Sequence, residues 1–131
     1  MGDAAQPQVL VADDDPLLRA IVEHKLAAAG YGVAVAADGR AALEQARRLR
    51  PQAIVLDAMM PVVDGFEALR RLKAEPSLRD IAVIMLTAIK RDEDIISALQ
   101  LGAADYVVKP FNPDELTVRL MRLVPRPEPA R

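Results

Sequence analysis

Cysteine is absent from the 131 residues, and histidine occurs only once. Without thiols the chain can form neither disulfides nor thiolate zinc sites, and one imidazole cannot build a histidine metal centre. A chain without disulfides fits a reducing compartment. The opening stretch MGDAAQPQ has no basic or apolar segment typical of a secretory signal, and no apolar run is long enough to cross a bilayer. We therefore expect a cytoplasmic protein that does not associate with membranes.

Positive charge is not in excess either, because 17 basic residues face 19 acidic ones and the net charge is −2. Nucleic-acid binding requires a basic surface, so we do not expect it from this domain alone. The hydrophobic content of 52% suits one domain with a single core. We place that domain at residues 9–124, after a flexible N-terminal segment at 1–8. The proline-rich stretch 125–131 is then an extended tail or linker.

Short apolar runs alternate with longer amphipathic stretches along the chain. The runs predict strands at Gln8–Ala12, Gly32–Ala37, Ala53–Asp57, Ile81–Leu86 and Tyr106–Val108. Helices are expected from Pro16 to Gly30, over Ala41–Arg50, from Asp64-Gly65 to Pro76, over Asp92–Leu101 and over Pro113–Val124. Leu17 and Ile21 fall on the apolar stripe of the first helix, and Leu49 on that of the second. Continuous apolar strands separated by helices predict an α/β fold, a single doubly wound domain whose parallel sheet is covered on both faces.

Polar residues collect where the predicted strands end. Asp13 and Asp14 follow the first strand, Asp57 ends the third, Thr87 follows the fourth and Lys109 the fifth. Each has an ordinary explanation alone, such as a helix cap, a turn, a strand residue or a solvated lysine. Ligands of open α/β sheets bind beyond the carboxyl ends of the strands, and all five residues are expected there. Their coincidence favours a functional site.

The chemistry of this set is specific. Three carboxylates in one cleft repel each other, and a hard divalent cation relieves that repulsion. Ligands that are all oxygen suit Mg²⁺, which keeps several waters and accepts phosphate oxygens. A nearby lysine adds positive charge without occupying a coordination position. Cation and lysine together can neutralise a phosphoryl group during transfer.

Four motifs in order carry a resemblance to a known family. They are VADDD at 11–15, LDAMMPVVDG at 56–65, LTA at 86–88 and VKPF at 108–111. With this set the chain resembles the receiver domain of bacterial two-component response regulators, over almost its whole length. The resemblance implies a flavodoxin-like, five-stranded parallel sheet in the order 2-1-3-4-5 flanked by five helices.

The resemblance also implies a role for each acidic residue. Asp57 would be the phosphoacceptor, and Asp57 and Asp14 would bind Mg²⁺ through their carboxylates. Asp13 would act on the metal through water, and the backbone carbonyl of Met59 would complete the protein ligands. The phosphoryl donor would be a sensor histidine kinase or a phosphotransfer protein. The product would be an aspartyl phosphate that is lost slowly by self-catalysed hydrolysis, so the chain would not be an enzyme in the usual sense.

Thr87 and Lys109 would contact the phosphoryl group, with the lysine directed by a cis peptide to Pro110. Thr87 and Tyr106 would be the moving parts of a switch. The switch would bias the face made by the fourth helix, fifth strand and fifth helix, which would act on an effector domain or protein. Asp105 and Arg119 match charged positions through which receivers of the transcription-factor type dimerise.

Ala104 and Ile95 depart from the charged pattern of that type. The sequence therefore does not decide whether the chain forms a homodimer through this face. Met59 and Ile89 would flank the path of the attacking water, and since neither can orient water, the acyl phosphate should be long-lived.

Three other interpretations compete with the phosphorylated receiver domain. A haloacid-dehalogenase-like phosphatase would use Asp13 as its nucleophile, with Asp13-Asp14-Asp15 as its D-x-D motif, but Pro16 and Leu17 replace the usual continuation and a cap domain would not fit. A receiver fold that is never phosphorylated would be a pure interaction module, although every residue needed for the chemistry is present. A flavin-binding domain fits less well, because an acidic first loop would repel the flavin phosphate.

Overall fold

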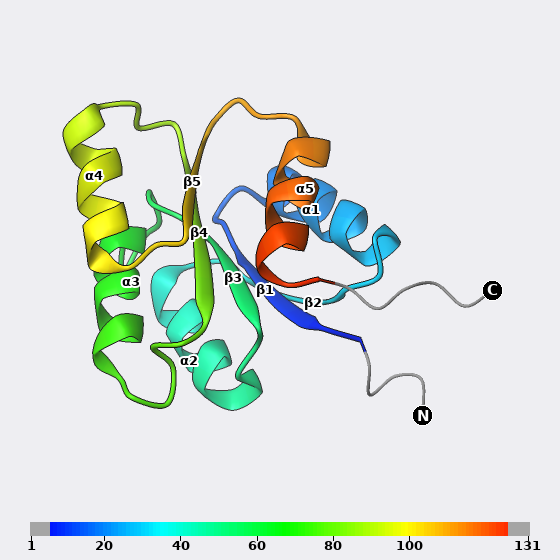
Figure 1. The fold of residues 1–131 in the computed structure, drawn as a ribbon, viewed down its shortest axis with the longest axis horizontal. Helices are drawn as coiled ribbons and strands as arrows, with labels where there is room; N and C mark the ends of the chain where they lie inside the picture. Colours follow the sequence, from blue (N-terminus) through cyan, green and yellow to red (C-terminus); the bar gives the residue numbers. More distant parts are fainter. Residues whose placement is uncertain (1–5, 126–131) are drawn as a thin grey trace.

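The chain alternates strands and helices throughout residues 6–125, the part that this computed structural model describes (Figure 1). The strands are β1 (Gln8–Ala12), β2 (Gly32–Ala36), β3 (Ala53–Asp57), β4 (Ala82–Thr87) and β5 (Asp105–Val108). The helices are α1 (Pro16–Ala28), α2 (Gly39–Leu49), α3 (Gly65–Ala74), α4 (Asp92–Leu101) and α5 (Pro113–Leu123). Every predicted element is present, in the predicted order.

All strand pairs are parallel, and the sheet order is β2-β1-β3-β4-β5. The α/β fold and the strand order expected from the resemblance are therefore confirmed. This order places β1 and β3 side by side at the centre, with Ala12 paired to Leu56. The residues that follow these two strands consequently emerge next to each other.

Helices cover both faces of the sheet (Figure 1). α1 and α5 pack on one face, and α2, α3 and α4 pack on the other. Alternate residues of each buried strand supply the two cores: Val9 and Val11 face α1 and α5, whereas Leu10 and Ala12 face the other three helices. Because both faces are buried, the strands read as continuous apolar runs.

Several predicted boundaries were wrong by one or two residues. α2 begins at Gly39 and not at Ala41, because the carboxylate of Asp38 caps the helix by accepting the Ala41 N–H at 2.8 Å. It ends before Arg50, which has a left-handed φ of 46°. β2 stops short of Ala37, β4 covers Ala82–Thr87 in place of Ile81–Leu86, β5 begins at Asp105, and α5 ends at Leu123.

Three residues assigned to the inward stripes lie at the surface. Leu17 is 70% exposed, Ile21 is 40% exposed and Leu49 is 36% exposed. In α1 the fully buried side chains are those of Val22 and Leu26. Helical spacing alone did not separate the buried side chains of Val22 and Leu26 from the exposed ones of Leu17 and Ile21.

Residues 1–5 and 126–131 lie outside the described range, so the flexible N-terminal segment and the proline-rich tail stay predictions. Gln8, assigned to that segment, is the first residue of β1. Between residues 6 and 125, no helix combines the length and hydropathy that crossing a membrane would require.

Candidate functional site

The carboxyl ends of four strands bring the predicted site residues together. Asp13 directly follows β1, Asp57 is the last residue of β3, Thr87 is the last of β4, and Lys109 directly follows β5. A backbone hydrogen bond continues the sheet up to these residues, because the Lys109 N–H donates to the Thr87 carbonyl at 2.8 Å. The position of each functional group is therefore set by the sheet and not by a free loop.

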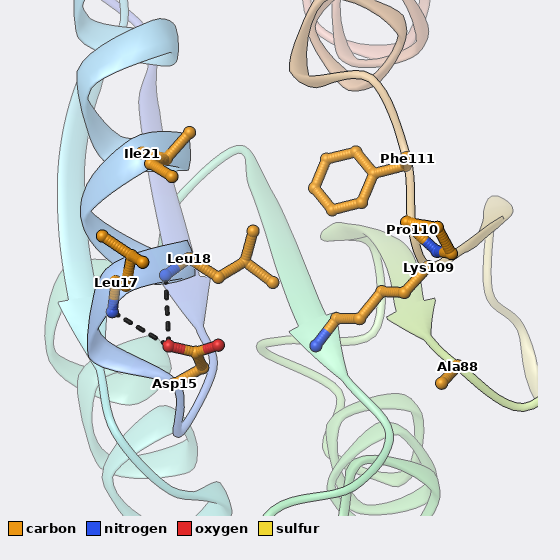
Figure 2. Close-up of a pocket in the computed structure, with 8 residues that line it drawn as sticks. All are labelled: Asp15, Leu17, Leu18, Ile21, Ala88, Lys109, Pro110 and Phe111. Atoms are coloured by element: carbon orange, nitrogen blue, oxygen red, sulfur yellow. Dashed lines mark hydrogen bonds between the residues drawn. The ribbon is translucent and has the colours of Figure 1, made fainter.

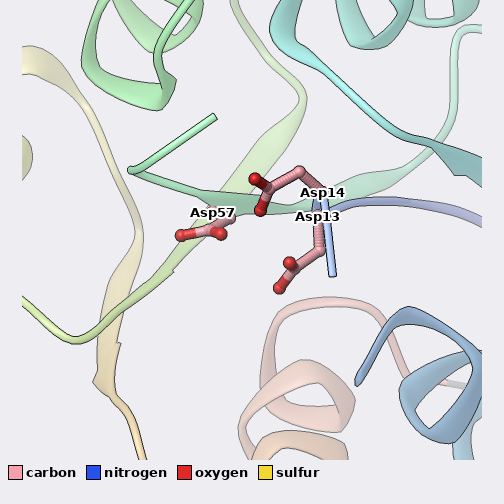
Figure 3. A group of neighbouring side chains, drawn as sticks. All are labelled: Asp13, Asp14 and Asp57. Atoms are coloured by element: carbon pink, nitrogen blue, oxygen red, sulfur yellow. The ribbon is translucent and has the colours of Figure 1, made fainter. Parts of the chain in front are cut away.

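Asp13, Asp14 and Asp57, here called the acidic cluster, each offer a carboxylate oxygen within 4.8 Å of the others (Figure 3). Asp13 is 1% exposed and Asp57 3% exposed, whereas Asp14 is exposed to solvent. Two buried carboxylates next to each other disfavour full ionisation unless positive charge compensates them. The cluster is open to solvent on the side of Asp14.

Lys109 supplies positive charge to the acidic cluster. Its Nζ donates to Asp13 Oδ2 at 3.1 Å and to Asp57 Oδ2 at 3.3 Å. The remaining oxygens accept backbone hydrogen bonds: Asp13 Oδ1 from the Asp15 N–H at 2.9 Å, and Asp57 Oδ1 from the Met59 N–H at 3.1 Å. The peptide bond between Lys109 and Pro110 is cis, as predicted.

Burial dominates the electrostatics of Asp57. It raises the pKa of this carboxyl from 3.8 to about 6, assisted by the charge of Asp13 and opposed by the Met59 N–H and by Lys109. The pKa of Lys109 is also raised: burial acts to lower it, but hydrogen bonds and charges from Asp13 and Asp57 prevail. Lys109 is thus held as a cation, and Asp57, with its pKa of about 6, is ionised above about pH 6.

The donor set fits Mg²⁺. The acidic cluster offers only oxygen atoms, partly buried and partly open to water, which suits a hard cation that keeps several waters of its own. Met59 lies in the loop that follows β3, and its backbone is held beside Asp57 because its N–H donates to the Asp57 carboxylate. Coordination by the Met59 carbonyl and a water-mediated role of Asp13 stay predictions.

Thr87 and Tyr106 both form hydrogen bonds with the backbone of Ile89, which lies between β4 and α4. The Thr87 hydroxyl is completely buried and accepts the Ile89 N–H at 3.3 Å, and within residues 6–125 it donates no hydrogen bond. The hydroxyl of half-buried Tyr106 donates to the Ile89 carbonyl at 2.9 Å. Both predicted switch residues therefore contact the backbone of the same residue.

An apolar groove of about 410 Å³ lies beside Lys109 and was not foreseen from the sequence (Figure 2). Leu17, Leu18 and Ile21 of α1 form one wall, and Phe111, after β5, faces them across the gap. The Lys109 side chain extends away from Phe111, and its ammonium reaches Asp13 and Asp57. The only sign of this groove in the sequence is the pair Leu17-Leu18 in the first turn of a helix. Their spacing did not show how far these side chains are exposed to solvent.

Arg19 was also missed. Its guanidinium donates to the Asp13 backbone carbonyl at 2.8 Å and so ties α1 to the loop that carries Asp13 and Asp14. The Asp15 carboxylate caps the same helix by accepting the N–H groups of Leu17 and Leu18 (Figure 2). Together these contacts fix the loop at the start of the acidic cluster.

Comparisons with known proteins agree with the geometry. The family described as response regulator receiver domain matches residues 9–121. The probable transcriptional regulator ycf27 of Porphyridium aerugineum is 43% identical over 123 residues, which cover 94% of this chain and 50% of the relative. RpaA of Synechocystis sp., a DNA-binding dual master transcriptional regulator, is 41% identical, with 92% of this chain and 50% of the relative covered. The chain spans about half the length of the curated relatives it matches.

One solved structure of similar fold contains a bound metal. The receiver domain of the sensor histidine kinase PA1611 from Pseudomonas aeruginosa PAO1, solved with a magnesium ion coordinated in its active-site cleft, is 37% identical with a TM-score of 0.82. The alignment covers 91% of this chain and 98% of that domain. The phosphatase and flavin-binding alternatives have no support among these findings.

Proposed function

The chain belongs to the response regulator receiver family, and on that premise we propose that it is a phosphoacceptor switch in which Asp57 takes and loses a phosphoryl group. One observation carries the proposal. Asp57 is buried at the end of a central strand, within the acidic cluster and 3.3 Å from the Lys109 ammonium. A nucleophile, a cation site and a fixed positive charge are thus supplied by three different strand ends.

In the proposed transfer, one carboxylate oxygen of Asp57 forms a bond to phosphorus while the bond from phosphorus to the donor breaks. The donor is a phosphohistidine or a small acyl phosphate, and the electron pair of the broken bond leaves with the donor group. Mg²⁺ held by the acidic cluster would neutralise phosphoryl oxygens. Lys109 would exchange its contact with Asp57 for one with the phosphoryl group while retaining its contact with Asp13.

Thr87 would supply the last hydrogen bond. Its hydroxyl proton is uncommitted within the described residues, but the side chain is completely buried. A turn of Thr87, or a movement of the segment holding Ile89, would bring this hydroxyl toward a phosphoryl group on Asp57. Because Tyr106 is bonded to the Ile89 carbonyl, such a movement would be transmitted to β5 and the face it shares with α4 and α5.

The apolar groove is the proposed docking place of the phosphodonor. Leu17 and Ile21 are exposed next to Lys109, so a helical domain of a histidine kinase or phosphotransfer protein could lay an apolar face there and present its phosphohistidine to Asp57. Several histidine kinases are first compared as phosphodonors to the wild type. Replacing Leu17 by Ser should then slow phosphoryl transfer from the kinase that labels the wild type fastest. Labelling by acetyl phosphate should stay within about twofold, since that donor needs no docking.

The proposed output is control of a partner. The relatives named above are transcriptional regulators of about twice the matched length, so an effector domain or protein acting through the α4-β5-α5 face fits this chain. Asp105 and Arg119 on this face form an ion pair within the chain, with Nη1 3.0 and 2.9 Å from the two carboxylate oxygens. A homodimer would require these groups to re-pair between copies.

Mass spectrometry tests the central claim. After incubation with acetyl phosphate and Mg²⁺, the wild type should gain one phosphoryl group, and with EDTA it should gain none. Asp57→Asn should abolish labelling, whereas Asp13→Asn should only weaken it. Labelling that survives Asp57→Asn but not Asp13→Asn would instead favour the phosphatase chemistry.

A further inference from the structure

The first residue of α2 lies in unusually close contact with the β3–α3 loop (residues 58–64). A Cβ built on Gly39 would lie only 1.8 Å from the Val63 carbonyl oxygen and 2.7 Å from its carbon. The obstacle is backbone and not the end of a flexible side chain. Gly39 has no left-handed φ, so backbone conformation does not require glycine there. The requirement for glycine comes from the contact alone.

The opposite end of the loop is held just as tightly. A Cβ on Gly65 would lie 2.2 Å from the Asp57 carbonyl oxygen, and the Gly65 N–H donates to the Ala58 carbonyl at 2.9 Å. Within the loop, the Met59 N–H is bonded to the Asp57 carboxylate. A displacement of Val63 is therefore passed along a short, closed loop to the backbone beside Asp57.

The loop should yield to a side chain at position 39 more readily than the helix. α2 is anchored by the buried side chains of Ala42, Leu43 and Ala46 and by its Asp38 cap. The loop is less embedded, since Met59 is 61% exposed and Val62 71% exposed. To reach an ordinary contact of 3.4 Å, the two segments would have to separate by about 1.6 Å.

We propose that Gly39 is a positioning residue for the Mg²⁺ site: by lacking a side chain, it lets the start of α2 seat the β3–α3 loop so that the Met59 backbone stays beside Asp57. This inference rests on the proposed function of that site. Mg²⁺ tolerates little distortion of its octahedral ligand geometry, and misplacements of about 1 Å can cost about a hundredfold in activity. The atoms nearest to a Cβ built on Gly39 all belong to Val63, so the residue would act on the site through the loop.

The test compares Gly39→Ala with Gly32→Ala. The control adds the same methyl group to a glycine whose close neighbours are all atoms of the flexible Gln8 side chain. Mg²⁺ dissociation constants are measured by isothermal titration calorimetry on the 131-residue chain at 10 °C, with thermal unfolding in parallel. Amide resonances of Met59, Val63 and, as an internal reference, Ala46 are followed by NMR.

We expect Gly39→Ala to weaken Mg²⁺ binding at least tenfold and to shift the Met59 and Val63 amides while Ala46 stays in place. Gly32→Ala should bind Mg²⁺ as the wild type does. An unchanged dissociation constant in folded Gly39→Ala would overturn the proposal, and so would a variant that fails to fold, because the loop would then not absorb the contact. A wild type that binds no Mg²⁺ would count against the proposed function itself.

Discussion

Replacing Asp57 by Asn should stabilise the metal-free protein at neutral pH. Burial raises the pKa of Asp57 to about 6 in the folded protein, against 3.8 for the ordinary side chain. The folded state therefore binds this proton more tightly than the unfolded chain does. As pH rises from about 4 to about 6, ionisation lowers the free energy of unfolding, and above that range the full loss is present.

The size of the effect follows from the same values. Each tenfold change in the acidity constant corresponds to about 1.4 kcal/mol, so the loss amounts to at most roughly 3 kcal/mol at pH 7.5. Asn cannot ionise, but its single amide oxygen can accept from Lys109 or from the Met59 N–H and not from both, so the gain stays below the full amount. The variant should gain stability up to this amount at pH 7.5, and the gain should fall to roughly a third of its value at pH 4.5.

Urea unfolding followed by circular dichroism in EDTA, at pH 7.5 and pH 4.5, measures both values. Asp14→Asn is the matched control, because it removes a charge from the same acidic cluster at an exposed position, and it should gain much less. Excess Mg²⁺ should stabilise the wild type and reduce the advantage of Asp57→Asn. Equal stability of the two proteins at pH 7.5, or an advantage that persists unchanged at pH 4.5, would refute the reasoning.

Three further outcomes are expected. Met59→Asn and Ile89→Glu should each speed loss of the acyl phosphate, about tenfold for a barrier lowered by ~1.4 kcal/mol; unchanged decay, followed by mass spectrometry, contradicts a role in gating water. Val62→Gly should raise stability in urea by about 1 kcal/mol, because Val62 is β-branched, exposed and held at a left-handed φ of 71°; a loss of stability speaks against strain there. With a beryllofluoride mimic the wild type should sediment as a dimer and Arg119→Ala as a monomer, while a wild type that stays monomeric argues against the re-pairing of Asp105 between copies.

The sequence by itself determined the α/β architecture and which residues lie together at the site. Strands buried on both faces must be continuously apolar, so their positions and their parallel pairing could be predicted. Asp13, Asp57, Thr87 and Lys109 each stand where such a strand ends, and parallel strands end at one edge of the sheet. Local rules also placed the caps: the predicted helix starts at Pro16 and Pro113 are the observed ones.

Only the tertiary structure decided how the elements pack against one another. Val22 and Ile21 are adjacent in α1, yet one is buried and the other lines a groove. Adjacent side chains of a helix point about 100° apart, and only the packing of α1 against the sheet decides which of the two directions is covered. The contact of Gly39 with Val63 joins segments 24 residues apart in the sequence, through backbone atoms that carry no sequence signal. The raised pKa of Asp57 is likewise a property of the assembled core, because desolvation depends on every atom packed around the carboxylate.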